Sequence, residues 1–206
     1  MHNSMCAMSR SILGVLLIWF LQVGFVHCVQ PRLNVTEHDI LKTLFDSTGG
    51  STGRWNYAGM ETCLTQDGGS IVIGRDWNFT KNAAGAYLDD PCQNDATSTK
   101  PFTGVYCACD AASCAVKDLV LPCGDLSGPI PEALGDLARL QQLVLFSNSL
   151  TGPIPEALGD LAQLQVLALE GNVLTGTVPS ELANLRNLTV LLLQNNSLVT
   201  NSVSNN

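Results

Sequence analysis

The sequence predicts an α/β repeat fold, a short solenoid in which each coil adds one strand to a parallel sheet. The first observation is a step of 24 residues between leucines with recurring surroundings, at Leu126, Leu150, Leu174 and Leu198. The second is the set of prolines between these leucines, which would break any long helix built from them. Residues 116–198 therefore form about four strand-bearing units, enough to bury a continuous core by stacking.

Within one unit, the spacing of residues defines a short strand followed by a turn. Leu143 and Leu145 alternate with residues that must lie on the opposite face of the strand, so the leucines are predicted to point into the core. An asparagine follows each strand, where its amide can satisfy backbone groups that no sheet ladder reaches. A stacked asparagine ladder is therefore expected at Asn148, Asn172 and Asn196.

The segment after each asparagine is predicted to turn the chain. In Thr-Gly-x-Ile-Pro the glycine supplies unusual backbone angles, and the proline opens a short helical turn on the far side. Each coil then returns beside its predecessor, so the strands pair in parallel. The carboxylates of Glu132 with Asp136, and of Glu156 with Asp160, recur with the repeat, and we expect them to be solvated on this convex side.

The repeated segment resembles the plant-type subclass of leucine-rich repeats, whose units carry an L-x-G-x-I-P segment. The resemblance covers residues 116–198. An earlier, poorer copy of the unit has Gly124 where the later copies have asparagine. The resemblance implies a short, right-handed leucine-rich-repeat solenoid with a parallel, concave sheet.

Residues 1–28 are predicted to be a secretory signal peptide. The apolar run from Ile12 to Val26 has 15 residues, short of the about 20 that a membrane-spanning helix needs. An uncleaved membrane anchor is the alternative. Cleavage after Cys28 removes Arg10 and no acidic residue, which changes the formal net charge from −8 to −9. Such an acidic body is a poor partner for nucleic acid.

Residues 29–115 are predicted to form an N-terminal cap that covers the apolar end of the first coil. A helix is expected to begin after Thr36, which can act as its N-cap, and to end at Gly49 and Gly50. An irregular, glycine-rich insertion follows at residues 60–90. The apolar face of the helix comprises Ile40, Leu41, Leu44 and Phe45.

The cysteines before the regular repeats predict a disulfide-bonded cap. The motifs Asp90-Pro91-Cys92 and Phe102-Thr-Gly-Val-Tyr-Cys107 resemble the cysteine-containing cap that precedes plant-type leucine-rich repeats, which implies a Cys92–Cys107 disulfide. Cys109 and Cys114 are close enough in sequence to close a small loop, which leaves Cys63 with Cys123, but four cysteines permit three pairings. A secreted context favours disulfides over a zinc site, so we expect no metal.

Catalytic chemistry is not predicted. His38 is the one histidine beyond the predicted signal peptide, and no nucleophile motif lies near it. Glycine-rich phosphate loops are absent from the sequence. We therefore expect the protein not to be an enzyme and to need no cofactor.

Four Asn-x-Ser/Thr sequons are compatible with glycosylation of a secreted protein. A glycan on the last of them would crowd one end of the concave face. The sequons are at Asn34, Asn78, Asn187 and Asn195.

The strand residues that point away from the core are the predicted ligand-binding face, because curved parallel sheets of this kind present them side by side. One column is an apolar stripe, and Phe146 is the only aromatic residue of the face. Strand propensity alone explains any single one of these residues equally well. Lys117, Asp118, Pro122 and Ser147 adjoin the predicted contacts, which are Val120, Gln142, Val144, Phe146, Val166, Ala168, Glu170, Val190, Leu192 and Gln194.

We therefore expect a secreted, extracellular recognition module that binds a protein, peptide or glycan through its concave face. The resemblance implies two sharper alternatives, the ectodomain of a receptor-like kinase or membrane-anchored receptor in signalling, and a secreted inhibitor of cell-wall hydrolases of the polygalacturonase-inhibitor type. A structural matrix protein is a further alternative.

Residues 199–206 are predicted to be a polar tail that cannot cover the last coil. We expect either a partner or a homodimer over the unit 185–198, or a chain truncated from a longer array. Membrane association is expected only if the N-terminal segment is uncleaved or the chain is truncated, and the cell surface is then the alternative location.

Overall fold

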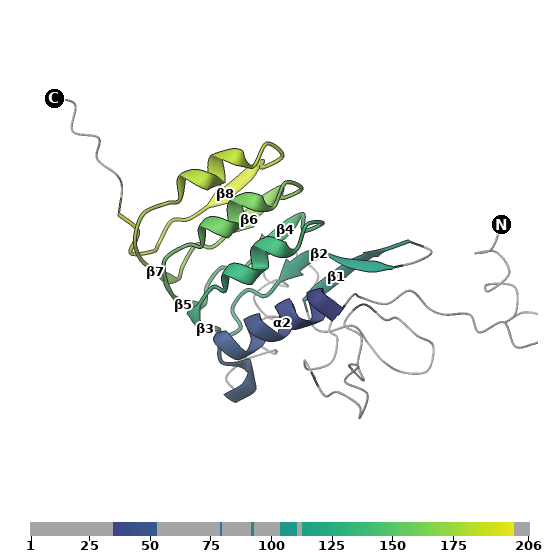
Figure 1. The fold of residues 1–206 in the computed structure, drawn as a ribbon. Helices are drawn as coiled ribbons and strands as arrows, with labels where there is room; N and C mark the ends of the chain where they lie inside the picture. The colour runs from purple at the N-terminus through teal and green to yellow at the C-terminus, as the bar shows by residue number, and fades with distance from the viewer. Residues whose placement is uncertain (1–34, 53–78, 80–91, 93–103, 111–112, 200–206) are drawn as a thin grey trace, which may run out of the picture.

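The computed structural model describes residues 35–52, 79, 92, 104–110 and 113–199. Within these ranges the chain is a stack of similar coils with a helix against its N-terminal end (Figure 1). The predicted signal peptide, Asn34, Cys63 and Asn78 lie outside the described residues.

The main sheet has five strands in the order β1-β2-β4-β6-β8. The strands are β1 (Val105–Cys109), β2 (Cys114–Val120), β4 (Gln142–Val144), β6 (Val166–Ala168) and β8 (Val190–Leu192). From β2 to β8 the strands pair in parallel, and Leu119, Leu143, Leu167 and Leu191 lie in register. The predicted parallel sheet is therefore confirmed, with one strand for each coil. The antiparallel pairing of β1 with β2 was not predicted.

A second sheet, of three parallel strands, was also not predicted. Its strands are β3 (Ser127–Pro129), β5 (Ser149–Gly152) and β7 (Val173–Leu174). These strands lie at or beside the segments that were predicted only to turn the chain. Val199, assigned to the polar tail, bridges to Thr177 and donates its backbone N–H to the Gly176 carbonyl at 2.8 Å. The regular repeat therefore continues at least to Val199.

Each coil makes one short turn of 3-10 helix on the side away from the main sheet. These turns are η2 (Glu132–Asp136), η3 (Glu156–Asp160) and η4 (Ser180–Asn184), and a proline with extended backbone precedes each of them, as predicted. They stack so closely that a Cβ at Gly135 would lie 2.3 Å from the Ala157 carbonyl oxygen. Glycine at this position therefore allows consecutive coils to approach each other.

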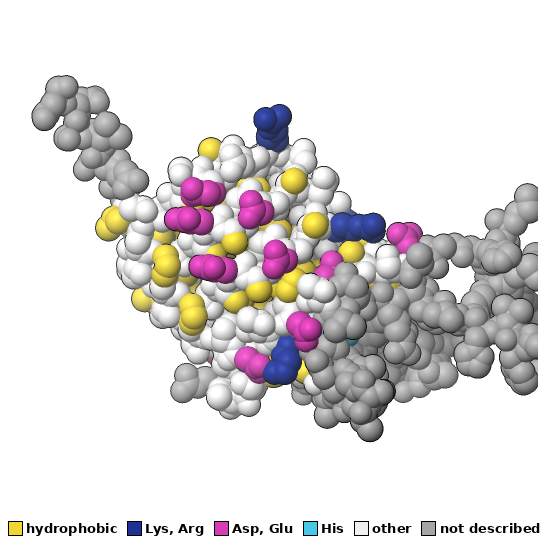
Figure 2. All heavy atoms as spheres, in the orientation of Figure 1, with side chains coloured by type: hydrophobic (Ala, Val, Ile, Leu, Met, Phe, Trp, Pro, Cys, Tyr) yellow, Lys and Arg dark blue, Asp and Glu magenta, His cyan; other side chains and the backbone are white. Residues whose placement is uncertain are grey.

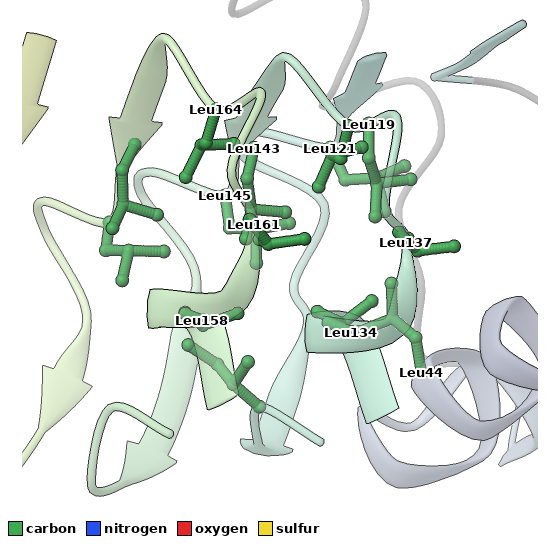
Figure 3. Close-up of a cluster of buried hydrophobic side chains, with 14 of the residues drawn as sticks. Leu44, Leu119, Leu121, Leu134, Leu137, Leu143, Leu145, Leu158, Leu161 and Leu164 are labelled. Atoms are coloured by element: carbon green, nitrogen blue, oxygen red, sulfur yellow. The ribbon is translucent and has the colours of Figure 1, made fainter. Parts of the chain in front are cut away.

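The core between the strands and the 3-10 turns is made of leucines (Figure 3). Leu143 and Leu145 point inward from β4 and the residue after it, and both are fully buried, as predicted. Leu158 and Leu161 enter the same core from the helical side. Leu191 occupies the place of Leu143 in the last coil but is 44% exposed, because no further coil among the described residues covers it.

The predicted asparagine ladder is confirmed, and it connects neighbouring coils. The Asn172 side-chain amide donates to the carbonyls of Leu169 in its own coil and Leu145 in the preceding coil, both at 3.0 Å. Its Oδ1 accepts the Leu150 N–H at 3.0 Å. Asn148 and Asn196 make equivalent bonds, and Asn148 Oδ1 also accepts the N–H of Gly124, where the first coil has no asparagine.

Helix α2 (Val35–Ser47) covers the first coil. Ile40, Leu41 and Leu44 are buried, and Leu44 lies beside Leu134 and Leu137 of the first coil in Figure 3. Because the helix already begins at Val35, Thr36 lies in its first turn and does not act as the predicted N-cap.

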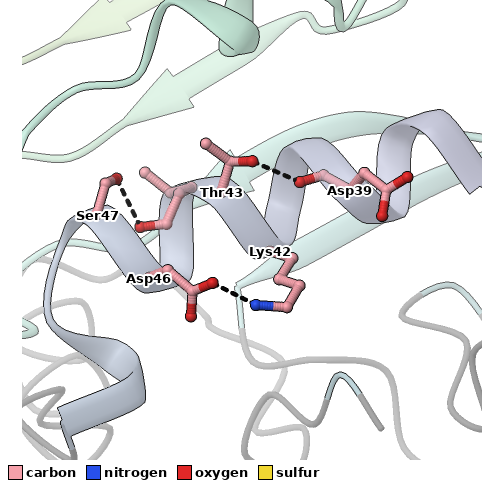
Figure 4. Close-up of polar contacts among 6 residues, drawn as sticks. Asp39, Lys42, Thr43, Asp46 and Ser47 are labelled. Carbon is pink, nitrogen blue, oxygen red and sulfur yellow. Dashed lines mark hydrogen bonds and ion pairs between the residues drawn. The ribbon is translucent and has the colours of Figure 1, made fainter. Parts of the chain in front are cut away.

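The C-terminal end of α2 joins the repeats. The helix ends before Gly49, whose φ is +90°, and the Thr48 carbonyl accepts the N–H of Ser127 in β3 at 2.9 Å. The solvent-exposed side of α2 carries local contacts, including the Lys42–Asp46 ion pair and a hydrogen bond from the Thr43 hydroxyl to the Asp39 carbonyl (Figure 4). These exposed contacts contribute little to stability.

Two disulfides have both of their cysteines among the described residues. Cys92 bonds to Cys107, and Cys109 bonds to Cys114 next to the loop that connects β1 and β2. Both pairings are those expected from the sequence. Cys123 is also disulfide-bonded; its partner lies outside the described residues, so the pairing with Cys63 stays a prediction.

A buried carboxylate ties α2 to the main sheet. Glu37 Oε2 accepts the backbone N–H of Val116 in β2 at 2.9 Å. Burial raises the pKa of Glu37, while the bond from Val116 and the nearby charges of Arg139 and His38 act in the opposite direction. The ionised form of Glu37 is therefore less favourable in the folded protein than in the unfolded chain.

We predict that Asn172→Ala lowers the free energy of unfolding by about 2–4 kcal/mol, because it leaves a buried N–H and two buried carbonyls without partners. Urea-induced unfolding measures the change. The exposed Asn184→Ala is the matched control and should change stability by less than about 0.5 kcal/mol. Equal effects of the two substitutions would contradict a structural role for the ladder.

We predict that Glu37→Gln stabilises the protein more at pH 7 than at pH 3.5. A glutamine cannot ionise but still accepts the Val116 N–H. Because the folded pKa of Glu37 is raised, the contribution of this carboxyl group to stability falls as pH rises from below the unfolded pKa through the folded pKa, and the glutamine variant does not have this loss. Thermal unfolding of both proteins across this range is the measurement. The exposed Glu132→Gln serves as control, and a difference that is constant with pH or falls with it would refute the prediction.

Candidate ligand-binding face

The outward-pointing residues of the main sheet form a surface that we call the strand face. Leu119, Leu143 and Leu167 point into the core, so the residues on either side of each point outward. Strand register aligns these residues in three rows. The first row is Asp118, Gln142, Val166 and Val190; the second is Val120, Val144, Ala168 and Leu192; the third is Pro122, Phe146, Glu170 and Gln194.

The second row is the predicted apolar stripe. Val120, Val144 and Leu192 are half-buried, so each keeps part of its side chain available for contact. Ala168 is only 4% exposed. Its short side chain forms the floor of the stripe between larger neighbours, and its contact with a ligand stays a prediction.

The third row places an aromatic ring beside a carboxylate. Phe146 and Glu170 occupy equivalent positions in consecutive coils, and both are half-buried. The Ser147 N–H donates to the Glu170 carbonyl at 2.9 Å, and the Gly171 N–H donates to the Gln194 carbonyl at 3.0 Å. Because these backbone groups already pair between coils, recognition at this row depends on side chains.

The charge of the strand face is mostly acidic. Asp118 and Glu170 are its carboxylates, and Lys117 lies at its edge with its Nζ 3.6 Å from Asp118 Oδ2. In the described part of the chain, no arginine belongs to the three rows. The face therefore suits an apolar or basic ligand better than an acidic one.

The described residues contain no group of three or more histidine, cysteine, aspartate or glutamate side chains placed to hold a metal ion. His38 is buried in α2, which packs against η2 and not against the strand face. None of the described helices has the length and apolar character to span a bilayer.

The convex side carries exposed carboxylates on consecutive coils. Figure 2 shows acidic side chains in rows over the 3-10 turns. A shallow hollow of about 580 Å³ lies there, lined by Glu132, Pro153, Ile154, Pro155, Glu156, Ala157, Asp160 and Glu181. Glu132, Asp136, Glu156 and Asp160 are exposed, as predicted for solvated surface residues.

Two of the predicted glycosylation sites lie among the described residues. Asn187 and Asn195 are both exposed. The Asn187 side-chain amide donates to the Ala162 carbonyl at 2.8 Å, and Asn195 adjoins Gln194 of the strand face with a φ of +57°. Glycan attachment at either residue stays a prediction.

Comparison with known proteins identifies the repeats and the fold. Residues 138–198 match the family described as Leucine rich repeat, and no curated protein matches the chain in sequence. The fold is similar to that of the LRR ectodomain of the receptor kinase SOBIR1 from Arabidopsis thaliana, with 20% identity, 82% of this chain covered, 71% of that chain covered, and a TM-score of 0.56.

Two other solved structures are similar to parts of this chain. A chain of the BIR3–SERK2 complex from Arabidopsis thaliana is 29% identical over 68% of this chain and 69% of that one, with a TM-score of 0.48. The ectodomain of the receptor kinase GASSHO1/SCHENGEN3 from the same plant is 50% identical over 36% of this chain, with a TM-score of 0.36. The chain spans only 9% of that longer ectodomain.

We predict that Leu145→Ala and Phe146→Ala, which are adjacent in sequence, differ strongly in their effect on stability. Leu145→Ala opens a cavity in the core and should lower the free energy of unfolding by about 2–5 kcal/mol. Phe146→Ala removes a half-buried surface ring and should lower it by about 1 kcal/mol or less. Urea-induced unfolding of both variants is the test, and a loss at Phe146 as large as that at Leu145 would assign Phe146 to the core.

Proposed function

Because this chain is a plant-type leucine-rich-repeat solenoid with a disulfide-bonded N-terminal cap, we propose that it is an extracellular, non-catalytic module that binds a peptide or protein through its strand face. The observation that carries this proposal is the partial exposure of Val120, Val144 and Phe146 on a rigid sheet. Apolar side chains that stay partly exposed on a sheet are available to a partner.

The construction of the solenoid supports this use of the strand face. The inward leucines and the asparagine ladder hold the coils together, so the outward residues are free to vary without loss of the fold. An aromatic ring within a mainly apolar surface is a typical anchor for a protein partner. The backbone between these residues is fixed by sheet pairing, which lowers the entropy lost on binding.

The proposed location rests on the disulfides. Cys92–Cys107 and Cys109–Cys114 form and persist in oxidising compartments. Extracellular exposure also agrees with the predicted signal peptide. A released module and the ectodomain of a membrane-anchored receptor both agree with this location, and binding of a glycan stays a prediction from the sequence.

We predict that peptides selected from a displayed random library by the full chain, secreted from a eukaryotic host, require the strand face. Val144→Asp introduces a charge into the apolar stripe and should weaken their binding by at least about tenfold. Val173→Asp is the matched control, because Val173 is 50% exposed on β7, away from this face. Fluorescence anisotropy with a labelled selected peptide measures both.

Equal affinity of the wild-type protein and Val144→Asp for every selected peptide would overturn the proposed function. Circular dichroism and thermal unfolding of the two variants establish that each is folded, so a loss of binding is not a loss of structure.

A further inference from the structure

Two carboxylate oxygens on the strand face are buried without a hydrogen-bond partner. They are Asp118 Oδ1 and Glu170 Oε2. Lys117 lies 3.6 Å from the other Asp118 oxygen, and no ion pair among the described residues reaches Glu170. These two oxygens face away from solvent, but both side chains are only half-buried, so the remaining part of each carboxylate is open to a ligand. A partly buried carboxylate with one oxygen unpaired is costly, so a cationic donor at its exposed part is favoured.

Strand register places the two carboxylates at diagonally opposite corners of one part of the strand face, which extends from the first row to the third row and from β2 to the coil of β6. Asp118 lies in the first row on β2, and Glu170 lies in the third row, in the coil of β6. Two strand spacings and four residues along the strand separate their Cα atoms by about 16 Å in a flat sheet. Val144, on the intervening strand and in the middle row, lies halfway between them.

The surroundings of Glu170 favour an arginine over a small cation. Phe146 holds the equivalent position in the preceding coil and presents a half-buried ring beside the carboxylate. A guanidinium can donate to a carboxylate and stack on an aromatic face at the same time. At the other corner, Lys117 Nζ lies 3.6 Å from Asp118 Oδ2, which is too far for a hydrogen bond, so either a lysine or an arginine of the ligand suits this oxygen as a donor.

From this arrangement we propose that the strand face binds an extended peptide with the pattern basic-x-apolar-x-basic. One basic side chain pairs with Glu170 against Phe146, the other pairs with Asp118, and the apolar side chain packs on Val144. Alternate residues of an extended chain share one side, and four residues span about 13 Å. The flexible stems of the two basic side chains bridge the remaining distance.

Charge complementarity supports this ligand over an acidic or neutral one. The chain has a formal net charge of −8, so its field attracts a basic peptide during encounter. The inference rests on the proposed function, because it names the class of peptide that the same face would take.

The experiment compares two libraries of displayed peptides against the secreted full chain. In one library the pattern Arg-x-Leu-x-Arg is fixed, and in the other Glu-x-Leu-x-Glu is fixed, with all remaining positions random. We expect enrichment from the first library only. Binding of an enriched peptide should weaken about 10- to 100-fold in each of Glu170→Gln and Asp118→Asn, because each substitution removes one charge-assisted contact.

Matched controls separate this effect from a general loss of negative charge. Glu156→Gln and Asp160→Asn make the same chemical changes on the convex side and should leave the affinity within about twofold. Higher salt should weaken binding to the wild-type protein more than to Glu170→Gln. Thermal unfolding should show that Glu170→Gln does not lower the melting temperature, since the substitution removes a buried charge without a partner.

The possible results distinguish the inference from the proposed function. Peptides that lose affinity with Val144→Asp but not with Glu170→Gln or Asp118→Asn would overturn the basic pattern and leave the proposed function intact. Peptides indifferent to all three substitutions, or no enrichment from either library, would overturn both. Enrichment of the acidic pattern would also overturn the inference.

Discussion

The asparagine ladder is the interaction on which the rest of this structure depends. Each coil leaves backbone groups at the exit of its strand that neither sheet can pair, and a buried group without a partner is costly. Asn172 satisfies carbonyls of its own coil and of the preceding one, so the bond forms only when the two coils are in register. The constant step of 24 residues in the sequence is the consequence, because a change in coil length would separate the amide from these groups.

Stacking also determines how well the leucines are covered at the two ends of the solenoid. The first coil has α2 against its leucines, and the buried Glu37 joins this helix to β2. At the other end, Leu191 has the same place in its coil as Leu143 but is largely exposed. The position of a coil in the stack therefore decides how much of its leucine is buried, although the residue type is the same.

The two faces of the main sheet have separate roles. The inward leucines and the ladder hold the coils together, whereas the strand face contributes little to the core. On that face, Phe146 and Val144 lie between two carboxylates whose inner oxygens lack donors. The convex side has more carboxylates, but they are exposed to water and recur with a duplicated unit, so hydration already satisfies them. Acidic residues alone thus do not mark the site; their burial beside apolar side chains does.

The sequence by itself determined the period, the parallel pairing, the inward leucines, the ladder and the 3-10 turns after proline. It also identified the outward residues, because alternation along a strand decides which way a side chain points. Only the tertiary structure revealed the second sheet, the β1–β2 hairpin, the burial of Glu37 and Ala168, and the two carboxylate oxygens without donors. The physical reason is that periodicity encodes the direction of a side chain within its own coil, whereas burial and pairing depend on distances to residues in other coils and in the cap. Those distances exist only after the coils have stacked.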